Sequence, residues 1–288
     1  MTRKLSKLRS LIDMSRSVTI LFLLLNTLSL TSQEPAYLEL VIAEARLKGL
    51  FDQLYAGSLA EKEPLLDTIR EEMSKALSMP GTLEFPWSRL DKIGNIRSED
   101  KRMRIFSWHV EDDKDHYRYF GYMLVGMKRG KVKLYELKDN GKPQRGMIKY
   151  DQKKNDWYGK LYYQVLSNKY KRKTYYTLLG MDFNNMHSTI KSVEVMVIQR
   201  NEPHFVRSLF SKGSDFADRV VLEYAKQVAI SVRYDPGSGM ITFDHLVPFH
   251  PIYENNFEFY GPDGSFDGLE FERGHWIYRD DIDARNID

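Results

Sequence analysis

Apolar side chains recur at helical spacing in the first part of the chain and at alternate positions in the rest, and the period changes near Pro80. A period of 3.6 residues is typical of amphipathic helices, whereas a period of two is typical of half-buried strands. We therefore predict a helical segment at residues 33–82 and an antiparallel β domain at residues 83–288. Gly57 and Ser58 interrupt the helical pattern, so the segment is expected to contain two helices.

The second helix has two possible starts. Ser58 and Glu61 have the spacing of a capping box, which satisfies backbone N–H groups at a helix N-terminus. That start places Pro64 inside the helix, where proline removes a hydrogen bond. We therefore expect the helix to begin near Lys62, with Pro64 in its first turn. The helical pair is expected either to cover the β domain or to bind a partner.

The clearest β pattern lies between Arg219 and Pro248, where we predict two long strands joined by a tight turn. The apolar face of the first strand consists of Val228, Ile230, Val232 and Tyr234. Residues 235–239 stop this strand, because proline restricts φ and glycine permits positive φ. Alternation then resumes from Met240.

Several other segments repeat this alternation. Strands are predicted at residues 103–110, 117–126, 131–137, 157–166, 173–180 and 190–198, with a shorter region at 257–279. Their spacing follows no fixed repeat. The protein is therefore predicted to be mainly β with an N-terminal helical pair, and its antiparallel meander is expected to form a sandwich, a barrel or an irregular propeller-like body.

The first 32 residues have the order of a secretory signal peptide. A basic region is followed by an apolar run at residues 18–30 and then by small residues that end at Ser32. This run is shorter than the roughly 20 residues of a membrane-spanning helix. We therefore expect cleavage rather than anchoring, and no transmembrane span after cleavage. Met14 is an alternative start for the same signal.

Charge and cysteine content restrict the expected partners and cellular location of the protein. The signal segment carries more than the whole formal net charge of +3, so the mature chain gives no reason to expect nucleic acid as a partner. The chain has no cysteine, which excludes disulfides and thiol catalysis. An exported chain of this size without disulfides is typical of a bacterial periplasm. The expected location is periplasmic or extracellular.

Three stretches carry a resemblance to other proteins. They are TYYTLLGMDFNN at residues 174–185, the segment 219–248 with VRYD and ITFDHLVP, and YGPDGSFDGLEFERGHWIYRDDIDARN at residues 260–286. Together they resemble a set of exported proteins of Bacteroidota over residues 100–288. The resemblance implies export and a bacterial envelope setting. It implies no particular activity and supplies no catalytic residues.

Two oxygen-rich segments are candidate cation sites. One contains Asp182 and Asn184, and the other contains Asp263 and Asp267 among glycines. Calcium binds several oxygens of a flexible loop, so calcium is a possible ligand, although neither segment completes a known metal-binding spacing. The alternative is a pair of turns whose carboxylates accept backbone N–H groups. We favour the turns, and no metal or other cofactor is predicted.

Asp244 and His245 are the remaining candidates for chemistry. A histidine beside a carboxylate can act as a general base. Adjacent residues of a strand point to opposite faces, however, so Asp244 is not expected to orient His245, which should share the face of Phe243. The usual hydrolase, metalloprotease and phosphate-binding motifs are absent from the sequence. Catalytic residues therefore stay unassigned.

A group of aromatic residues offers either a binding platform or core. Its members are Trp157, Tyr158, Tyr162, Tyr163, Tyr175 and Tyr176. The sequence as a whole favours an exported envelope protein that binds an envelope protein or a glycan without catalysis. The alternatives are a secreted hydrolase with a carboxylate-based site in the C-terminal half, and a carbohydrate-binding module.

Overall fold

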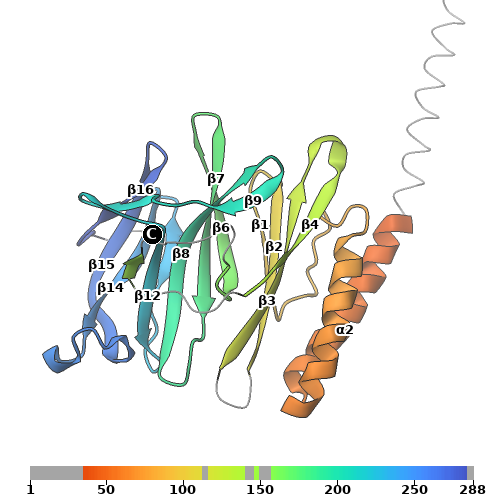
Figure 1. Ribbon diagram of the computed structural model, residues 1–288, viewed down its shortest axis with the longest axis horizontal. Helices are drawn as coiled ribbons and strands as arrows, with labels where there is room; N and C mark the ends of the chain where they lie inside the picture. The colour runs from red at the N-terminus through yellow and green to blue at the C-terminus, as the bar shows by residue number, and fades with distance from the viewer. Residues whose placement is uncertain (1–34, 112–115, 140–145, 149–156, 284–288) are drawn as a thin grey trace, which may run out of the picture.

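In the computed structural model, the described residues are 35–111, 116–139, 146–148 and 157–283. The predicted signal peptide lies outside them. Within the described residues, two N-terminal helices are followed by strands that form three mostly antiparallel sheets. The layers follow one another in the order helices, first sheet, second sheet and third sheet, from right to left in Figure 1. The prediction of a mainly β protein with a helical pair is confirmed.

The helical pair comprises residues 35–56 and α2 (Leu59–Leu77). The predicted start near Lys62 is wrong, because the helix begins directly after Ser58. The backbone N–H and the Oγ of Ser58 both donate to the Glu61 carboxylate, at 2.8 and 2.7 Å. Pro64 therefore lies inside α2. The capping hydrogen bonds offset the one hydrogen bond that Pro64 cannot donate.

The first sheet is antiparallel and has the order β1-β2-β3-β4. Its strands are β1 (Gly94–Arg97), β2 (Met103–Glu111), β3 (Tyr117–Gly126) and β4 (Val132–Leu137). Both faces of β2 are buried: Phe106 and Trp108 pack against the helices, while Met103 and Ile105 belong to the core shared with the second sheet. The sheet is therefore an interior layer of the molecule.

The second sheet has the order β5-β12-β8-β7-β6, and β9 pairs with β8 outside this path. Its strands are β5 (Gly146–Ile148), β6 (Leu161–Tyr170), β7 (Lys173–Asp182), β8 (Ser188–Gln199), β9 (Glu202–Phe205) and β12 (Arg219–Ala225). The predicted strand at 157–166 is displaced, since β6 begins at Leu161. Alternate residues face two different cores: Leu178 faces the first sheet, and Leu179 faces the third.

The third sheet has the order β11-β10-β16-β15-β14-β13 and contains one parallel pair, β10 with β16. Its strands are β10 (Phe210–Lys212), β11 (Asp215–Ala217), β13 (Val232–Asp235), β14 (Met240–Pro248), β15 (Tyr260–Glu272) and β16 (His275–Arg279). None of the sheets formed by the described strands closes into a barrel. They stack face to face, and each interface holds its own apolar core.

The segment from Arg219 to Pro248 is not the single long hairpin that its pattern predicts. β12 belongs to the second sheet, and β13 begins at Val232 rather than at Val228. The tight turn itself is present, because the Asp235 carboxylate accepts the backbone N–H groups of residues 237 and 238. The chain therefore crosses from one sheet to the next inside this segment.

β15 is the longest strand among those described, although its sequence is rich in glycine and aspartate. Its pairing with β14 shifts between Asp244 and Leu246, so residues 263–265 bulge out opposite His245. Gly264 has a φ of +92° in this bulge, a backbone conformation that glycine adopts without strain. The expected turn is thus confined to a bulge inside a strand.

Candidate functional site

The second sheet carries a group of buried polar side chains on the face that it turns toward the first sheet. The group consists of Lys160, Tyr162, Ser192, Glu194 and Arg219, none of them more than 5% exposed. β-Sheet register places Arg219 of β12 directly opposite Glu194 of β8. Sequence reasoning missed this group, because its members come from three separate regions of the chain.

Glu194 is the centre of the group. Its Oε2 lies 2.7 Å from the Nε of Arg219 and 3.3 Å from the Nζ of Lys160. Its Oε1 accepts the hydroxyl of Tyr162, and the Lys160 Nζ also lies 2.9 Å from the Oγ of Ser192. Buried charges are tolerated when they are paired and hydrogen-bonded in this way.

Burial and ion pairing shift the pKa values of Lys160 and Glu194 in opposite directions. Burial lowers the pKa of Lys160, and the neighbouring Glu194 carboxylate opposes that shift. Burial alone would raise the pKa of Glu194, but the charges of Arg219 and Lys160 hold it below its usual value. Glu194 is therefore an ionised carboxylate at neutral pH.

Two features of the surroundings accommodate the buried side chains of Lys160 and Arg219. A Cβ at Gly180 would lie 2.7 Å from the Cδ of Lys160, so only glycine at this position of β7 leaves space for the lysine stem. The guanidinium carbon of Arg219 lies 4.4 Å from the ring centroid of Tyr158 and 5.2 Å from that of Phe205. Cation–π contacts with aromatic rings stabilise a partly desolvated guanidinium.

The predicted candidates Asp182 and Asn184 lie at the end of β7 and are both buried. The Oδ1 of Asp182 accepts the hydroxyl of Tyr119 at 2.8 Å and the backbone N–H of Asn184 at 2.7 Å. The Asn184 Nδ2 donates to Ser188 and Glu223. The structure thus brings the two candidates together in a hydrogen-bonded turn between the first and second sheets.

The candidates His245 and Asp267 meet in the third sheet. The Nδ1 of His245 lies 2.7 Å from the Oδ2 of Asp267, which also accepts the Tyr278 hydroxyl, while Oδ1 accepts the Asp281 N–H at 3.1 Å. Asp267 is almost fully buried, whereas the His245 side chain is 40% exposed. Because the carboxylate accepts from Nδ1, we assign the proton to Nδ1, which leaves Nε2 as an acceptor.

Asp244 accepts the backbone N–H of Ser231 at 2.5 Å, as expected for a side chain on the face opposite His245. Asp263 accepts the N–H and the hydroxyl of Ser265, and these hydrogen bonds lower its pKa. Within the part of the chain that the structure describes, no three acidic or histidine side chains converge as a metal site.

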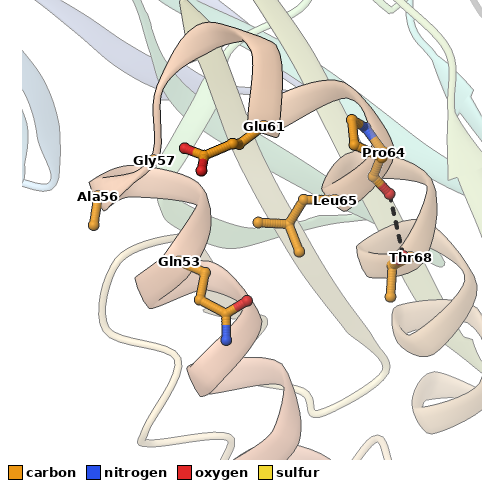
Figure 2. A pocket seen from close by; sticks show the side chains of 7 residues that line it. All are labelled: Gln53, Ala56, Gly57, Glu61, Pro64, Leu65 and Thr68. Carbon is orange, nitrogen blue, oxygen red and sulfur yellow. Dashed lines mark hydrogen bonds between the residues drawn. The ribbon is translucent and has the colours of Figure 1, made fainter.

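The helical pair carries a pocket of about 600 Å³ beside the turn between its helices. Its lining residues are Gln53, Ala56, Gly57, Glu61, Pro64, Leu65 and Thr68. Figure 2 shows Leu65 pointing into the gap between the two helices, with the Glu61 carboxylate on the side of Gly57. A second pocket of about 300 Å³ lies between the start of α2 and the β2–β3 strands, next to Arg118.

An exposed stripe runs along one side of the first helix and leads to the larger pocket, which Gln53 and Ala56 line. Its members are Leu38, Ile42, Ala45, Gln53 and Ala56, at intervals that return to the same side of a helix. Leu38 and Ile42 are 59% and 61% exposed. The stripe is apolar or small over most of its length, whereas a solvent-facing helix side usually carries charged residues.

The aromatic group does not form the flat platform that was one of its two possible roles. Trp157, Tyr158, Tyr162 and Tyr176 are all at least 96% buried. Among the six, Tyr163 is the one with a large exposed fraction. These rings are therefore mainly core residues between the sheets.

Comparison of the chain with protein-family models, curated proteins and solved structures finds no match. Neither helix in the described part of the chain is long and apolar enough to cross a bilayer.

Proposed function

We propose that this protein is exported to the bacterial envelope and acts there by binding an apolar helical segment of a partner protein along its own helical pair. The observation that carries the proposal is the pocket between the helices, together with the exposed stripe that leads to it. Small side chains on a helix surface allow another backbone to approach closely, and exposed leucine and isoleucine supply apolar area.

Export is supported by the order of residues 1–32, by the absence of cysteine and by the resemblance to exported Bacteroidota proteins. N-terminal sequencing of protein from the native envelope should give a chain that begins near Gln33. A chain that keeps residues 18–30 in the membrane would contradict cleavage.

Photo-crosslinking in the native host would test the binding face. A photoreactive residue at Gln53 should give an adduct of discrete mass, and the substitution Ile42→Glu should abolish it. The same photoreactive residue at Lys128, an exposed position in the turn between β3 and β4, is the control and should give no such adduct. Absence of an adduct at Gln53, or its persistence with Ile42→Glu, would refute binding at this face.

The His245–Asp267 pair favours a second candidate function, a hydrolase with a carboxylate-based site in the C-terminal half. A histidine held at Nδ1 by a carboxylate can accept a proton at Nε2 from water or from a substrate. The candidate would be supported if the purified protein hydrolysed an ester, glycoside or peptide substrate and His245→Gln abolished turnover without lowering the melting temperature. Equal rates in both proteins would exclude it.

A further inference from the structure

Lys160 and Glu194 present an amine and a carboxylate to each other in an environment closed to water. Their side chains are 2% and 1% exposed, and the Nζ lies 3.3 Å from Oε2. The amine is therefore held beside the carboxyl group whose Cδ it would attack, so the entropy of encounter is already lost. The binding face on the helices and the His245 site use neither residue.

The surroundings favour a nucleophilic amine. Burial lowers the pKa of Lys160, so its neutral form is more accessible than that of a solvated lysine. The Ser192 Oγ accepts a hydrogen bond from the same Nζ at 2.9 Å and so orients the amine. The proton that the amine loses can pass to the Glu194 carboxylate, whose Oε2 lies 3.3 Å from Nζ.

The surroundings also polarise the carboxyl group. The Arg219 Nε donates to Oε2 at 2.7 Å, and the Tyr162 hydroxyl donates to Oε1. Donors on both oxygens withdraw electron density from Cδ and are placed to stabilise the charge of a tetrahedral intermediate. Exclusion of water strengthens these interactions and removes the competing hydrolysis.

We propose that Lys160 and Glu194 condense to an intramolecular amide. The Lys160 nitrogen lone pair forms a bond to Cδ of Glu194, and the Cδ–Oε2 bond breaks. Two of the three ammonium protons pass to Oε2, which lies 3.3 Å from Nζ, and leave with it as one water molecule. The third proton stays on the amide nitrogen, and Oε1, which accepts the Tyr162 hydroxyl, becomes the amide carbonyl oxygen. The step converts an ion pair to an amide and water, so it needs no oxidant or other reactant.

The bond would join β8 to the segment that leads into β6, closing a loop between two residues 34 positions apart. A covalent loop restricts the unfolded chain, as a disulfide does. This chain has no cysteine and can form no disulfide. The amide would therefore give an exported protein a redox-independent cross-link.

Mass spectrometry of the full chain tests the proposal directly. The purified protein should be lighter than its sequence by the mass of one water, and a digest should contain one branched peptide that joins Lys160 to Glu194. A full sequence mass would overturn the proposal. A branch from Lys160 to a different carboxylate, such as Asp182, would overturn the assignment to Glu194.

Substitutions give a second readout that does not depend on stability. Lys160→Arg keeps the positive charge but removes the primary amine, so its mass should equal that of its sequence. Lys191→Arg is the matched control. Lys191 is a half-buried lysine on β8, the strand that carries Glu194, and its Nζ donates to the Ile230 carbonyl. The mass of the Lys191→Arg protein should still be lower than its sequence mass by one water. Loss of water in Lys160→Arg would contradict the proposal.

Discussion

At the scale of single residues, His109 is a half-buried base whose ring contacts are aromatic side chains rather than acids. Its ring packs against Tyr55, Tyr117, Tyr119 and Phe183, and its buried Nδ1 has no hydrogen-bond partner. Burial lowers the pKa of His109 to about 4, and the charges of Lys62 and Lys226 add to this shift. The folded state therefore favours the neutral imidazole.

This residue predicts an acid-dependent loss of stability. The unfolded chain binds the proton near pH 6.5 and the folded chain near pH 4, so stability should be full above pH 6.5 and should fall as the pH drops to about 4. The loss amounts to roughly 3 kcal/mol at the lower end. Urea unfolding at pH 7.5 and 4.5 should show a smaller difference in His109→Phe than in the wild type. Parallel losses in both proteins would contradict the prediction.

Asp263 and Asp267 lead to a prediction about calcium. The Asp263 carboxylate accepts hydrogen bonds from Ser265, and the Asp267 carboxylate is hydrogen-bonded to His245, Tyr278 and the Asp281 N–H. These contacts already stabilise both carboxylates, so calcium or a chelator should leave the melting temperature unchanged within error. A rise of the melting temperature with calcium, lost in Asp263→Asn, would show a cation site by mass action.

Residue type was enough to select His245 and Asp267 as candidates, but their contact was not predictable. It depends on the pairing of β14 with β15, which places Asp267 opposite Phe243 and so diagonal to His245, and the pairing register leaves no periodic signal in a single strand. Tyr278 completes the site from β16 and was missed for the same reason. Lys160 and Glu194 were missed because burial of a charge depends on a partner far away in the chain.

At the scale of elements, the β13–β14 hairpin is anchored in the core by the buried side of β13, a short strand at the edge of the third sheet. Val232 is 3% exposed in the core between the second and third sheets, and its neighbour Arg233 is exposed. Val232→Asp should lower the free energy of unfolding by roughly 3–5 kcal/mol, because it buries a charge without a partner.

Arg233→Asp is the matched control, since it changes the exposed side of the same strand. Surface substitutions of this kind usually change stability by about 0.5 kcal/mol or less. Urea denaturation of both variants gives the comparison. Equal midpoints would mean that the Val232 side of β13 is not buried.

Element types were predictable from period, whereas sheet membership was not. β12 contains three successive apolar residues and β13 alternates apolar with polar residues, so both are typical of strands, but only their nonlocal pairing shows that they belong to different sheets. The sequence alone favours a later start for α2 because Pro64 costs a backbone hydrogen bond, but the cap that Ser58 and Glu61 provide outweighs that cost. Local propensity is overridden in this way when a nearby hydrogen bond compensates.

At the scale of the whole molecule, the layered stack explains why the chain carries so many aromatic residues. A sheet that is covered on both faces needs apolar side chains at successive positions, and large rings fill the space between layers. The first sheet shows this directly, since Phe106 and Trp108 pack against the helices while Tyr119 faces the second sheet. The helical pair is therefore part of the core as well as a candidate binding face.

This arrangement predicts the behaviour of a fragment that begins at residue 83. Removal of the helices exposes the face of the first sheet that carries Phe106, Trp108 and Tyr122, which are buried in the full chain. The remaining strands keep their pairing, so circular dichroism should show a β spectrum with little helix. The exposed face should bind a hydrophobic dye and cause self-association in size-exclusion chromatography. A chain that begins at residue 35 is the control and should show neither effect. A fragment dominated by helix would refute the β assignment, and a monomeric fragment without dye binding would show that the helices do not cover this core.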